Sequence, residues 1–336
     1  MTSDTIRTDY VHCGAFTAKR FGALAALIAQ NTALVLVTKF SFSRGVLTPY
    51  LVSTVVACSE SLKFVVSCAL LTHTHGKGAA ISAMRDLRSN GARLALPSAL
   101  YVIQNNLLFK AVRLLSPTMY MVCSQSKILT SALFSVLLLN SRITRRQCLA
   151  LMTLVAGMIL VNASENPGGA ERVVASANGG DTSRGLLAVF TATFISGFAG
   201  AYLEKMYKSS NHGGAESHSD SVWFRNTQLA CFSVPVALMS AYWRDSAQIG
   251  HGGFFQGYDY VVGIVVVLQA TGGLVVALVM RHAGNILKCF AVSISMCNCA
   301  VFTCLVSSEQ MNVSTLVMGL ALVVVATFAY SARGVE

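Results

Sequence analysis

Seven ionisable side chains stand within stretches of the sequence that are otherwise apolar. They are Lys39, Glu60, Lys63, Lys127, Glu204, Arg225 and Lys288. An ionisable group in apolar surroundings is costly unless it faces water or a partner, so such residues are candidates for function. Five of the seven are cationic, and this surplus of positive charge predicts an anionic ligand.

Some of these charges have a simpler explanation. Glu60 and Lys63 are three residues apart, lie on one helix face and can neutralise one another. Lys39 and Arg225 lie near the ends of their apolar stretches, from which a long side chain can reach water. Glu204 suits packing or gating as well as ligand contact. We therefore expect Glu60, Lys63 and Glu204 to have structural or gating roles.

Lys127 and Lys288 remain. Neither has an acidic residue three or four positions away, so an anion is the simplest partner. Lysine binds phosphate as a point charge. Both lysines are therefore predicted to bind phosphate groups of a ligand.

Amide side chains occur in two of the same stretches. Gln104, Asn105 and Asn106 are consecutive in one, and Gln125 follows Tyr120 in the next. Amides both donate and accept hydrogen bonds, so together with a tyrosine ring they can read the edge and face of a nucleobase. The alternative is that they hydrogen-bond between helices.

The apolar stretches themselves predict the elements that position these residues. The chain has 336 residues, of which 54% are hydrophobic and 12% charged, and a mean hydropathy of +0.59. Roughly 20 helical residues cross a hydrocarbon core of about 30 Å. We expect an all-α, polytopic membrane protein with about ten transmembrane helices: 21–40, 47–71, 94–112, 118–139, 147–161, 185–206, 222–242, 258–280, 285–307 and 313–330.

The basic residues predict the orientation of these spans. A net charge of +11 could suit a nucleic-acid partner, but the basic residues are spread over alternate loops, as in membrane topology. One side holds Arg7, Lys19, Arg20, Lys77, Arg85, Arg88, Arg93, Arg142, Arg145, Arg146, Lys205, Lys208, Arg281 and Arg333. The other holds only Arg44, Lys110, Arg113, Arg172, Arg184 and Arg244. Both termini are therefore expected in the cytosol, and no nucleic-acid partner is expected.

Matching charges suggest two inverted repeats of five helices. Lys127 lies in the fourth span, and Lys288 lies in the ninth, five spans later. In the same way Glu60 and Lys63 lie in the second span, and Arg225 and Asn226 lie at the start of the seventh. The expected divisions are a cytosolic tail (1–20), a first repeat (21–163), a luminal loop (164–184), a second repeat (185–332) and a cytosolic tail (333–336). The first span is expected to act as a signal anchor.

Metal and cofactor sites are not expected. Most of the ten cysteines lie inside spans, where they behave as small apolar residues. Cys297 and Cys299 form a C-x-C pair without a second Cys or His pair at ligand spacing. Asn162 and Asn312 begin glycosylation sequons, but both abut a span, so their use is left open.

The sequence also contains a series of motifs. In order they are L-P-S-A-L-Y-V-I-Q-N-N from Leu96, Q-S-K from Gln125, S-G-F-A-G-A-Y-L-E-K from Ser196, R-N-T-Q-L from Arg225, Q-A-T-G-G-L from Gln269 and N-I-L-K from Asn285. This series resembles the nucleotide-sugar transporters of the UDP-galactose, UDP-N-acetylglucosamine and CMP-sialic acid branch, within the drug/metabolite transporter superfamily. The likeness runs from about residue 50 to residue 303.

The resemblance implies a ten-helix antiporter of the Golgi or endoplasmic reticulum membrane. It would exchange a cytosolic nucleotide sugar for a luminal nucleoside monophosphate by alternating access. Lys127 and Lys288 would bind the phosphates. The nucleoside and sugar would contact Tyr101, Gln104, Asn105, Tyr120, Gln125, Asn226, Ala230 and Asn285. The oligomeric state, including a homo-oligomer, is left open.

Departures from the family pattern bear on the cargo. The family's T-Y-Q-L-K is C-S-Q-S-K here, ending at Lys127, and its K-Y-A-D-N-I-L-K is R-H-A-G-N-I-L-K, ending at Lys288. CMP-sialic acid transporters tend to place a tyrosine where this chain has Ala230, and UDP-sugar transporters a small residue. Ala230 therefore favours a UDP-sugar, with UDP-galactose or UDP-N-acetylglucosamine preferred.

Other functions stay open with less support. The same fold could carry CMP-sialic acid in exchange for CMP, or another anionic sugar phosphate. A membrane enzyme would need a catalytic constellation, but His73 and His75 lie in a loop without acidic neighbours, and His282 lies among basic residues. A purely structural role would leave Lys127 and Lys288 without a purpose.

Overall fold

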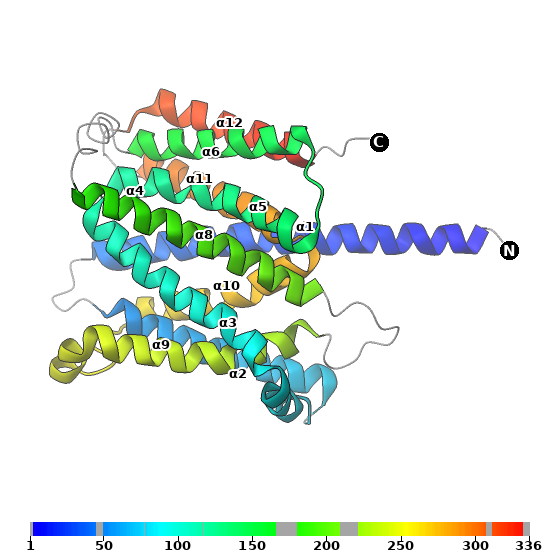
Figure 1. Cartoon of the computed structure of the whole chain (residues 1–336), viewed down its shortest axis with the longest axis horizontal. Helices are drawn as coiled ribbons and strands as arrows, with labels where there is room; N and C mark the ends of the chain where they lie inside the picture. Colours follow the sequence, from blue (N-terminus) through cyan, green and yellow to red (C-terminus); the bar gives the residue numbers. More distant parts are fainter. Residues whose placement is uncertain are drawn as a thin grey trace. The chain divides into compact units, whose positions relative to one another are not determined.

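A computed structural model describes residues 3–44, 50–76, 78–115, 117–165, 180–208, 221–306 and 311–331, and every regular element in them is an α-helix (Figure 1). The helices are α1 (Ser3–Ser43), α2 (Val52–His75), α3 (Ala79–Leu114), α4 (Pro117–Ser124), α5 (Ser126–Leu139), α6 (Arg145–Glu165), α8 (Gly180–Lys208), α9 (Val222–Gly252), α10 (Tyr260–His282), α11 (Asn285–Val306) and α12 (Val313–Ser331). The predicted all-α class is confirmed.

Eight segments within the described residues are long and apolar enough to cross a membrane. They are Lys19–Phe42, Val52–His75, Val122–Leu139, Arg145–Ser164, Thr182–Lys208, Tyr260–His282, Asn285–Val306 and Val313–Ser331. Each overlaps one of the predicted spans, so the chain is a polytopic helical membrane protein.

The two other predicted spans lie within α3 and α9, which are helical but are not among the eight. Both carry polar residues that lower their hydropathy, such as Gln104 in α3 and Arg225, Asn226 and Gln228 in α9. The count of ten spans therefore stays a prediction.

The helices extend beyond several predicted boundaries. α1 begins at Ser3, within the predicted tail 1–20. α6 continues to Glu165, and α8 begins at Gly180, so both ends of the predicted loop 164–184 are helical. The rest of that loop and the tail 333–336 lie outside the described residues. The limits of the two predicted repeats stay a prediction.

The chain forms two compact units. The first unit comprises Met1–Ser98 and Met206–Ala291, and the second comprises Ala99–Lys205 and Val292–Glu336. In the first unit α1 packs against α10, and α2 packs against both α9 and α10; in the second unit α12 packs against α6. The boundary in α3 falls beside Pro97, which removes one backbone donor from the helix interior.

A close approach of α1 and α10 organises the first unit. Leu27 and Val279 are almost completely buried there. The Gln30 amide of α1 donates a hydrogen bond of 2.8 Å to the Leu268 carbonyl of α10. Gly272 makes room for this amide, because a Cβ atom at Gly272 would lie 2.5 Å from Gln30 Nε2. Gly272 therefore allows α1 to pack closely against α10.

One end of the same unit is held by polar contacts. Arg44, just after α1, forms an ion pair of 2.5 Å with Asp259, the residue that caps α10. The pKa of the Asp259 carboxyl is lowered, first because it accepts the backbone N–H of Val262 and also because of Arg44. Arg44 lies over the rings of Phe40 and Tyr260 as well. These contacts fix the start of α10 to the end of α1.

Glycine brings α6 and α12 together in the second unit. A Cβ atom at Gly319 of α12 would lie 2.8 Å from the backbone nitrogen of Val161 and 2.9 Å from the carbonyl oxygen of Gly157. The reverse holds for Gly157, where a Cβ atom would lie 3.0 Å from the Gly319 carbonyl oxygen. The two helix backbones therefore touch, and no larger residue fits without separating them.

The first prediction tests this contact. Gly319→Ala should destabilise the protein by about 1–3 kcal/mol, the usual cost of overpacking, because the new methyl group meets backbone atoms. The measurement is thermal unfolding of purified protein in detergent. Gly263→Ala in α10 is the control, since nothing lies within 4 Å of a Cβ atom there. Equal unfolding temperatures for the two variants would contradict the account.

Candidate functional site

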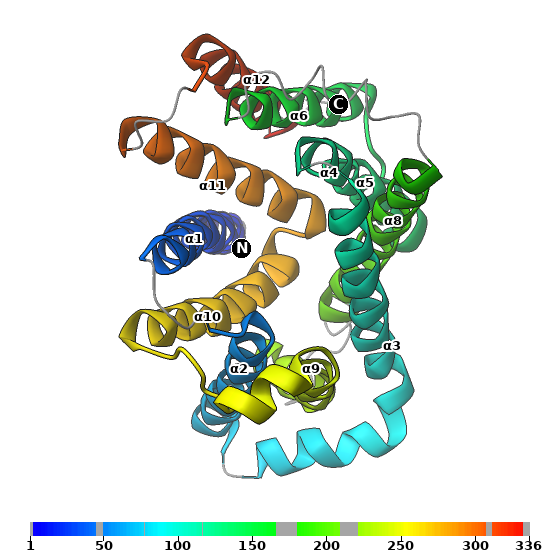
Figure 2. The same ribbon diagram turned by 90° about the vertical axis from the view of Figure 1, so that its left-hand side faces the viewer.

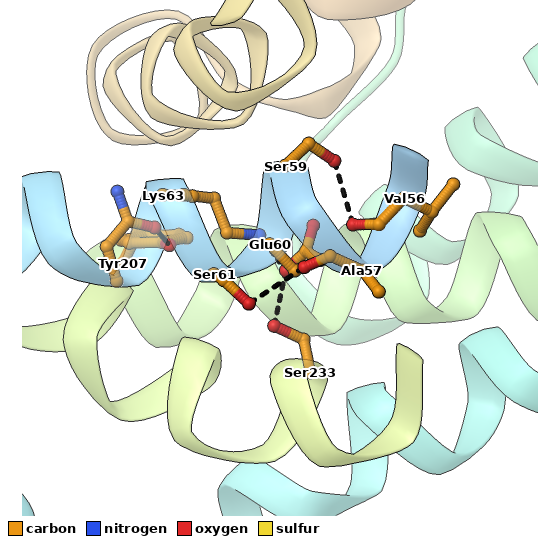
Figure 3. Close-up of polar contacts among 9 residues, drawn as sticks. Val56, Ala57, Ser59, Glu60, Ser61, Lys63, Tyr207 and Ser233 are labelled. Carbon is orange, nitrogen blue, oxygen red and sulfur yellow. Dashed lines mark hydrogen bonds and ion pairs between the residues drawn. The ribbon is translucent and has the colours of Figure 1, made fainter. Parts of the chain in front are cut away.

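Glu60 and Lys63 form an ion pair inside the first unit (Figure 3). Lys63 Nζ lies 2.5 Å from Glu60 Oε2, one helical turn away on α2. The same carboxylate oxygen accepts a hydrogen bond from the Ser233 hydroxyl of α9. One carboxylate oxygen of the half-buried Glu60 therefore interacts with two donors, and the hydrogen bond from Ser233 joins α9 to α2.

The lysine of this pair also reaches a third helix. Gly273 of α10 faces it, because a Cβ atom at Gly273 would lie 2.7 Å from Lys63 Cδ. Only glycine lets the lysine stem pass so close to the α10 backbone. Glu60, Lys63, Ser233 and Gly273 thus form one cluster, hereafter the α2 ion-pair cluster. Whether Glu60 and Lys63 act in gating stays a prediction.

Asn226 lies near the start of α9 and is buried. Its Oδ1 atom accepts a hydrogen bond of 2.7 Å from the Tyr207 hydroxyl. Its Nδ2 group is buried and has no hydrogen-bond partner among the described residues. Ala230, one turn further along, has no exposed surface. The Asn226 amide therefore has an unsatisfied N–H donor, which could bind a carbonyl oxygen of a ligand.

Arg225 and Lys39 were both expected to reach water from near the ends of their spans. Lys39 is exposed on α1. Arg225 is only half-buried, and one of its guanidinium nitrogens lies 3.4 Å from Gln228 Oε1. Its Nε group is buried and unpartnered within the described part of the chain. The Arg225 Nε–H group is thus a second unsatisfied donor, next to Asn226 in the sequence.

Lys288 lies in the first turn of α11. A tight turn precedes that helix, and Gly284 adopts φ +89° in it, a conformation that favours glycine. Asn285, the first residue of α11, is buried. The N-terminus of a helix carries a partial positive charge and free N–H groups. Lys288 therefore adds its charge to an end of a helix that already favours anions.

Lys127 lies at the second residue of α5 and is exposed. Only Gln125 separates α4 from α5, and its backbone keeps helical dihedral angles of φ −65° and ψ −19°. Two hydrogen bonds of the 3₁₀ type lie on either side of it: the Gln125 N–H donates to the Val122 carbonyl, and the Ile128 N–H donates to the Gln125 carbonyl. Tightening of this kind within a helix often marks a functional hinge or a strained stretch of sequence. Because α4 abuts α5 directly, the helix dipole adds little here, and Lys127 itself supplies the charge.

Tyr101 and Gln104 of α3 and Tyr120 of α4 belong to the second unit. Gln104 is buried, and its Oε1 atom has no partner among the described residues. Tyr101, one turn earlier, is exposed. Tyr120 packs against the apolar cluster that includes Met119 and Val189. Gln104 therefore offers a spare acceptor, as base recognition requires.

The predicted site residues divide between the two compact units. The first unit holds Glu60, Lys63, Asn226, Ala230, Asn285 and Lys288, and the second holds Tyr101, Gln104, Asn105, Tyr120, Gln125, Lys127 and Glu204. Glu204 is buried in α8, and the side chain of Asn105 lies outside the described set. The ligand roles of all of these residues stay predictions.

Two participants were missed by sequence reasoning. Ser233 lies seven residues after Asn226, so it shares a helix face with Asn226 and Ala230, and this spacing could have revealed it. Asp86 accepts a hydrogen bond of 2.9 Å from the Gln228 amide of α9. No pattern in the sequence pairs Asp86 with a residue so far away.

Nearly the whole chain is similar to proteins that are already known. A family model described as nucleotide-sugar transporter matches residues 16–331. A UDP-N-acetylglucosamine/UDP-N-acetylgalactosamine transporter of Caenorhabditis elegans, nstp-4, is 40% identical over 322 residues, or 92% of each chain. The human UDP-N-acetylglucosamine transporter is 38% identical over 94% of this chain and 96% of its own length.

Two further relations are more distant. The bovine UDP-galactose translocator is 37% identical over 82% of this chain and 68% of its own length. One crystal structure matches with a TM-score of 0.66 over 96% of this chain and 99% of the other, at 14% identity. That likeness concerns the fold alone.

The second prediction tests the α2 ion-pair cluster. Ser233→Ala should lower the free energy of unfolding by about 1.5–3 kcal/mol, the usual contribution of a hydrogen bond to a charged group. Ser61→Ala is the matched control, because the Ser61 hydroxyl donates only to the Ala57 carbonyl within its own helix. The measurement is unfolding by denaturant in mixed micelles. Equal losses in the two variants would show that the Ser233 hydroxyl contributes nothing to Glu60.

Proposed function

The chain belongs to the nucleotide-sugar transporter family, and on that premise we propose that it exchanges a cytosolic UDP-sugar for luminal UMP across the Golgi or endoplasmic reticulum membrane. Its relatives are transporters and not enzymes, so the chain is a transporter of nucleotide sugars and not an enzyme. The observation that carries the proposal is the family match, which extends over nearly the whole chain.

UDP-N-acetylglucosamine and UDP-galactose are the cargoes that we propose. The relatives at 37% to 40% identity are named as transporters of UDP-N-acetylglucosamine, UDP-N-acetylgalactosamine or UDP-galactose. The small side chain of Ala230 agrees with this choice. Lys127 and Lys288 bind the phosphates in this proposal, and the unsatisfied Nδ2 donor of Asn226 suits a carbonyl group of the uracil ring.

Alternating access on two inverted repeats of five helices is the proposed mechanism. Two of the helix pairs that pack together support it. α2 and α9 are the second and seventh predicted spans, and α6 and α12 are the fifth and tenth. Both pairs join a span to its counterpart five spans later, as expected for helices near the pseudo-twofold axis of an inverted repeat. The division of basic residues supports cytosolic termini.

Exchange, in this proposal, follows from the negative charge that both cargoes carry. The phosphates of the UDP-sugar neutralise the two lysines on the inward step, and the phosphate of UMP does so on the return. A carrier that returned empty would move these two cations without a ligand phosphate to offset their charge. Exchange is therefore favoured over transport in one direction.

The third prediction tests the phosphate assignment. Lys127→Gln and Lys288→Gln should each lower the uptake of UDP-N-acetylglucosamine by proteoliposomes loaded with UMP by about tenfold or more, since a charge-assisted hydrogen bond contributes about 1.5–3 kcal/mol. Lys→Arg at either position keeps the charge but changes its geometry, so it should cost less. Lys39→Gln is the control on an exposed lysine. Normal uptake by the double glutamine variant would remove the assignment.

The fourth prediction concerns the base. The protein should exchange UMP faster than CMP. Ala230→Tyr should reduce exchange of UMP more than that of CMP, by about fivefold to tenfold, the scale of one change in pocket packing. Because the comparison is a ratio measured on one preparation, poor expression cancels. An unchanged ratio, or faster exchange of CMP by the unmodified protein, would contradict the preference for uridine.

A further inference from the structure

α3 is longer than a membrane span requires. It has 36 residues, which corresponds to roughly 54 Å at about 1.5 Å per residue. A hydrocarbon core of about 30 Å accommodates roughly 20 of them, and the predicted span 94–112 takes up the second part of the helix. The first part, residues 79–93, contains Arg85, Asp86, Arg88 and Arg93 and therefore lies outside the hydrocarbon core.

A tight turn ties this first part to the end of a span. α2 is a candidate span up to His75, and α3 begins at Ala79. Gly76 adopts φ +88°, its N–H donates to the Thr72 carbonyl at 2.9 Å, and its carbonyl accepts the N–H of Ala79 at 3.1 Å. Since the connection is so short, α3 starts at the membrane surface.

The inner face of these first turns is fixed to the first unit. Ala79 and Ala83 are 5% and 0% exposed and belong to an apolar cluster with Phe224 of α9. Gln228 of α9 donates hydrogen bonds to the Ala83 carbonyl at 3.2 Å and to the Asp86 carboxylate at 2.9 Å. Figure 2 shows this cyan start of α3 beside α2 and α9. This contact sets the rotation of the helix about its axis.

The outer face carries two large apolar side chains and a cation. At 100° per residue, Met84, Ile81 and Arg85 follow one another around the side opposite Ala79 and Ala83. Ile81 is 61% exposed and Met84 is 42% exposed, and Arg85 is exposed as well. This outer arc is amphipathic, with its apolar part and its basic residue side by side.

We propose that the first turns of α3 form an interfacial helix that binds an anionic bilayer surface. Ile81 and Met84 insert at the boundary between headgroups and acyl chains, and Arg85 contacts lipid phosphates. The sequence from Lys77 to Arg93 supplies four basic residues against one acidic residue. Under the proposed orientation this face meets the cytosolic leaflet, whose anionic lipids attract basic segments.

A lipid surface fits this face better than a small anion. The side chains of the outer arc lie on a convex helix surface, so they cannot enclose a free phosphate. The attachment to α2 places the same arc at the level where headgroups begin. Apolar and basic side chains adjacent on one helix face are the pattern that lies in the plane of a membrane interface.

A tryptophan reporter tests the proposal in the full chain. The sequence has two tryptophans, Trp223 and Trp243, which are first replaced by phenylalanine. Ile81→Trp and Met84→Trp then place an indole on the apolar part of the arc, and Ser82→Trp places one on its far edge as a matched control. The proteins are reconstituted into vesicles of phosphatidylcholine and phosphatidylserine, with brominated acyl chains in either lipid.

Brominated acyl chains should strongly quench the fluorescence of an indole at position 81 or 84, because an interfacial helix buries its apolar face by about 5–10 Å. Aqueous iodide should quench an indole at position 82 more than one at position 81 or 84. Brominated phosphatidylserine should quench position 81 more than brominated phosphatidylcholine does. Arg85→Gln should reduce that preference by about fivefold, the ratio that corresponds to about 1 kcal/mol per basic residue, and Arg85→Lys should preserve it.

Other outcomes would overturn the proposal. Strong quenching by iodide at positions 81 and 84 would place the arc in water. Protection from both iodide and bromine would show that protein covers it, either a second copy or another partner. Equal quenching by the two lipids, with or without Arg85, would remove the role of the anionic headgroup.

Discussion

The cost of a charge in apolar surroundings governs this structure. At Glu60 and Lys63, close packing supplies a partner for each charge. Glu60 takes two donors from different helices, and Lys63 reaches it only because Gly273 lets its stem pass. Lys288 lies in the first turn of α11, at the positive end of that helix dipole. In the proposed function a ligand phosphate offsets this positive charge.

Close backbone contact is what makes these arrangements rigid. Gly272 admits the Gln30 amide to the α10 backbone, while Gly157 and Gly319 bring α6 and α12 together. In a membrane, helices gain little from the hydrophobic effect, so small residues and interhelical hydrogen bonds provide the cohesion. Each compact unit is thus fixed internally by a few positions, and a carrier that moves whole helix groups needs such rigid parts.

Much of this could be predicted from the sequence, because hydropathy and helical spacing are local properties. The eight apolar spans and the pairing of Glu60 with Lys63 follow from residues that are close together in the sequence. The bond from Ser233 to Glu60 and that from Gln228 to Asp86 depend on which helices become neighbours, which no single-chain pattern specifies. The tightening at Gln125 was missed because it depends on how the backbone turns between α4 and α5, which the polar run C-S-Q-S-K does not specify.

Exchange is the most direct test of the central claim, that ligand phosphate compensates the charge of Lys127 and Lys288. Purified protein is reconstituted into vesicles that are either loaded with UMP or empty, and the initial uptake of labelled UDP-N-acetylglucosamine is measured in both. The account predicts that internal UMP stimulates uptake many-fold, and that uridine, which has no phosphate, does not. Equal uptake into empty vesicles and vesicles loaded with UMP would show that the cations cross without an anion, and the account would be wrong.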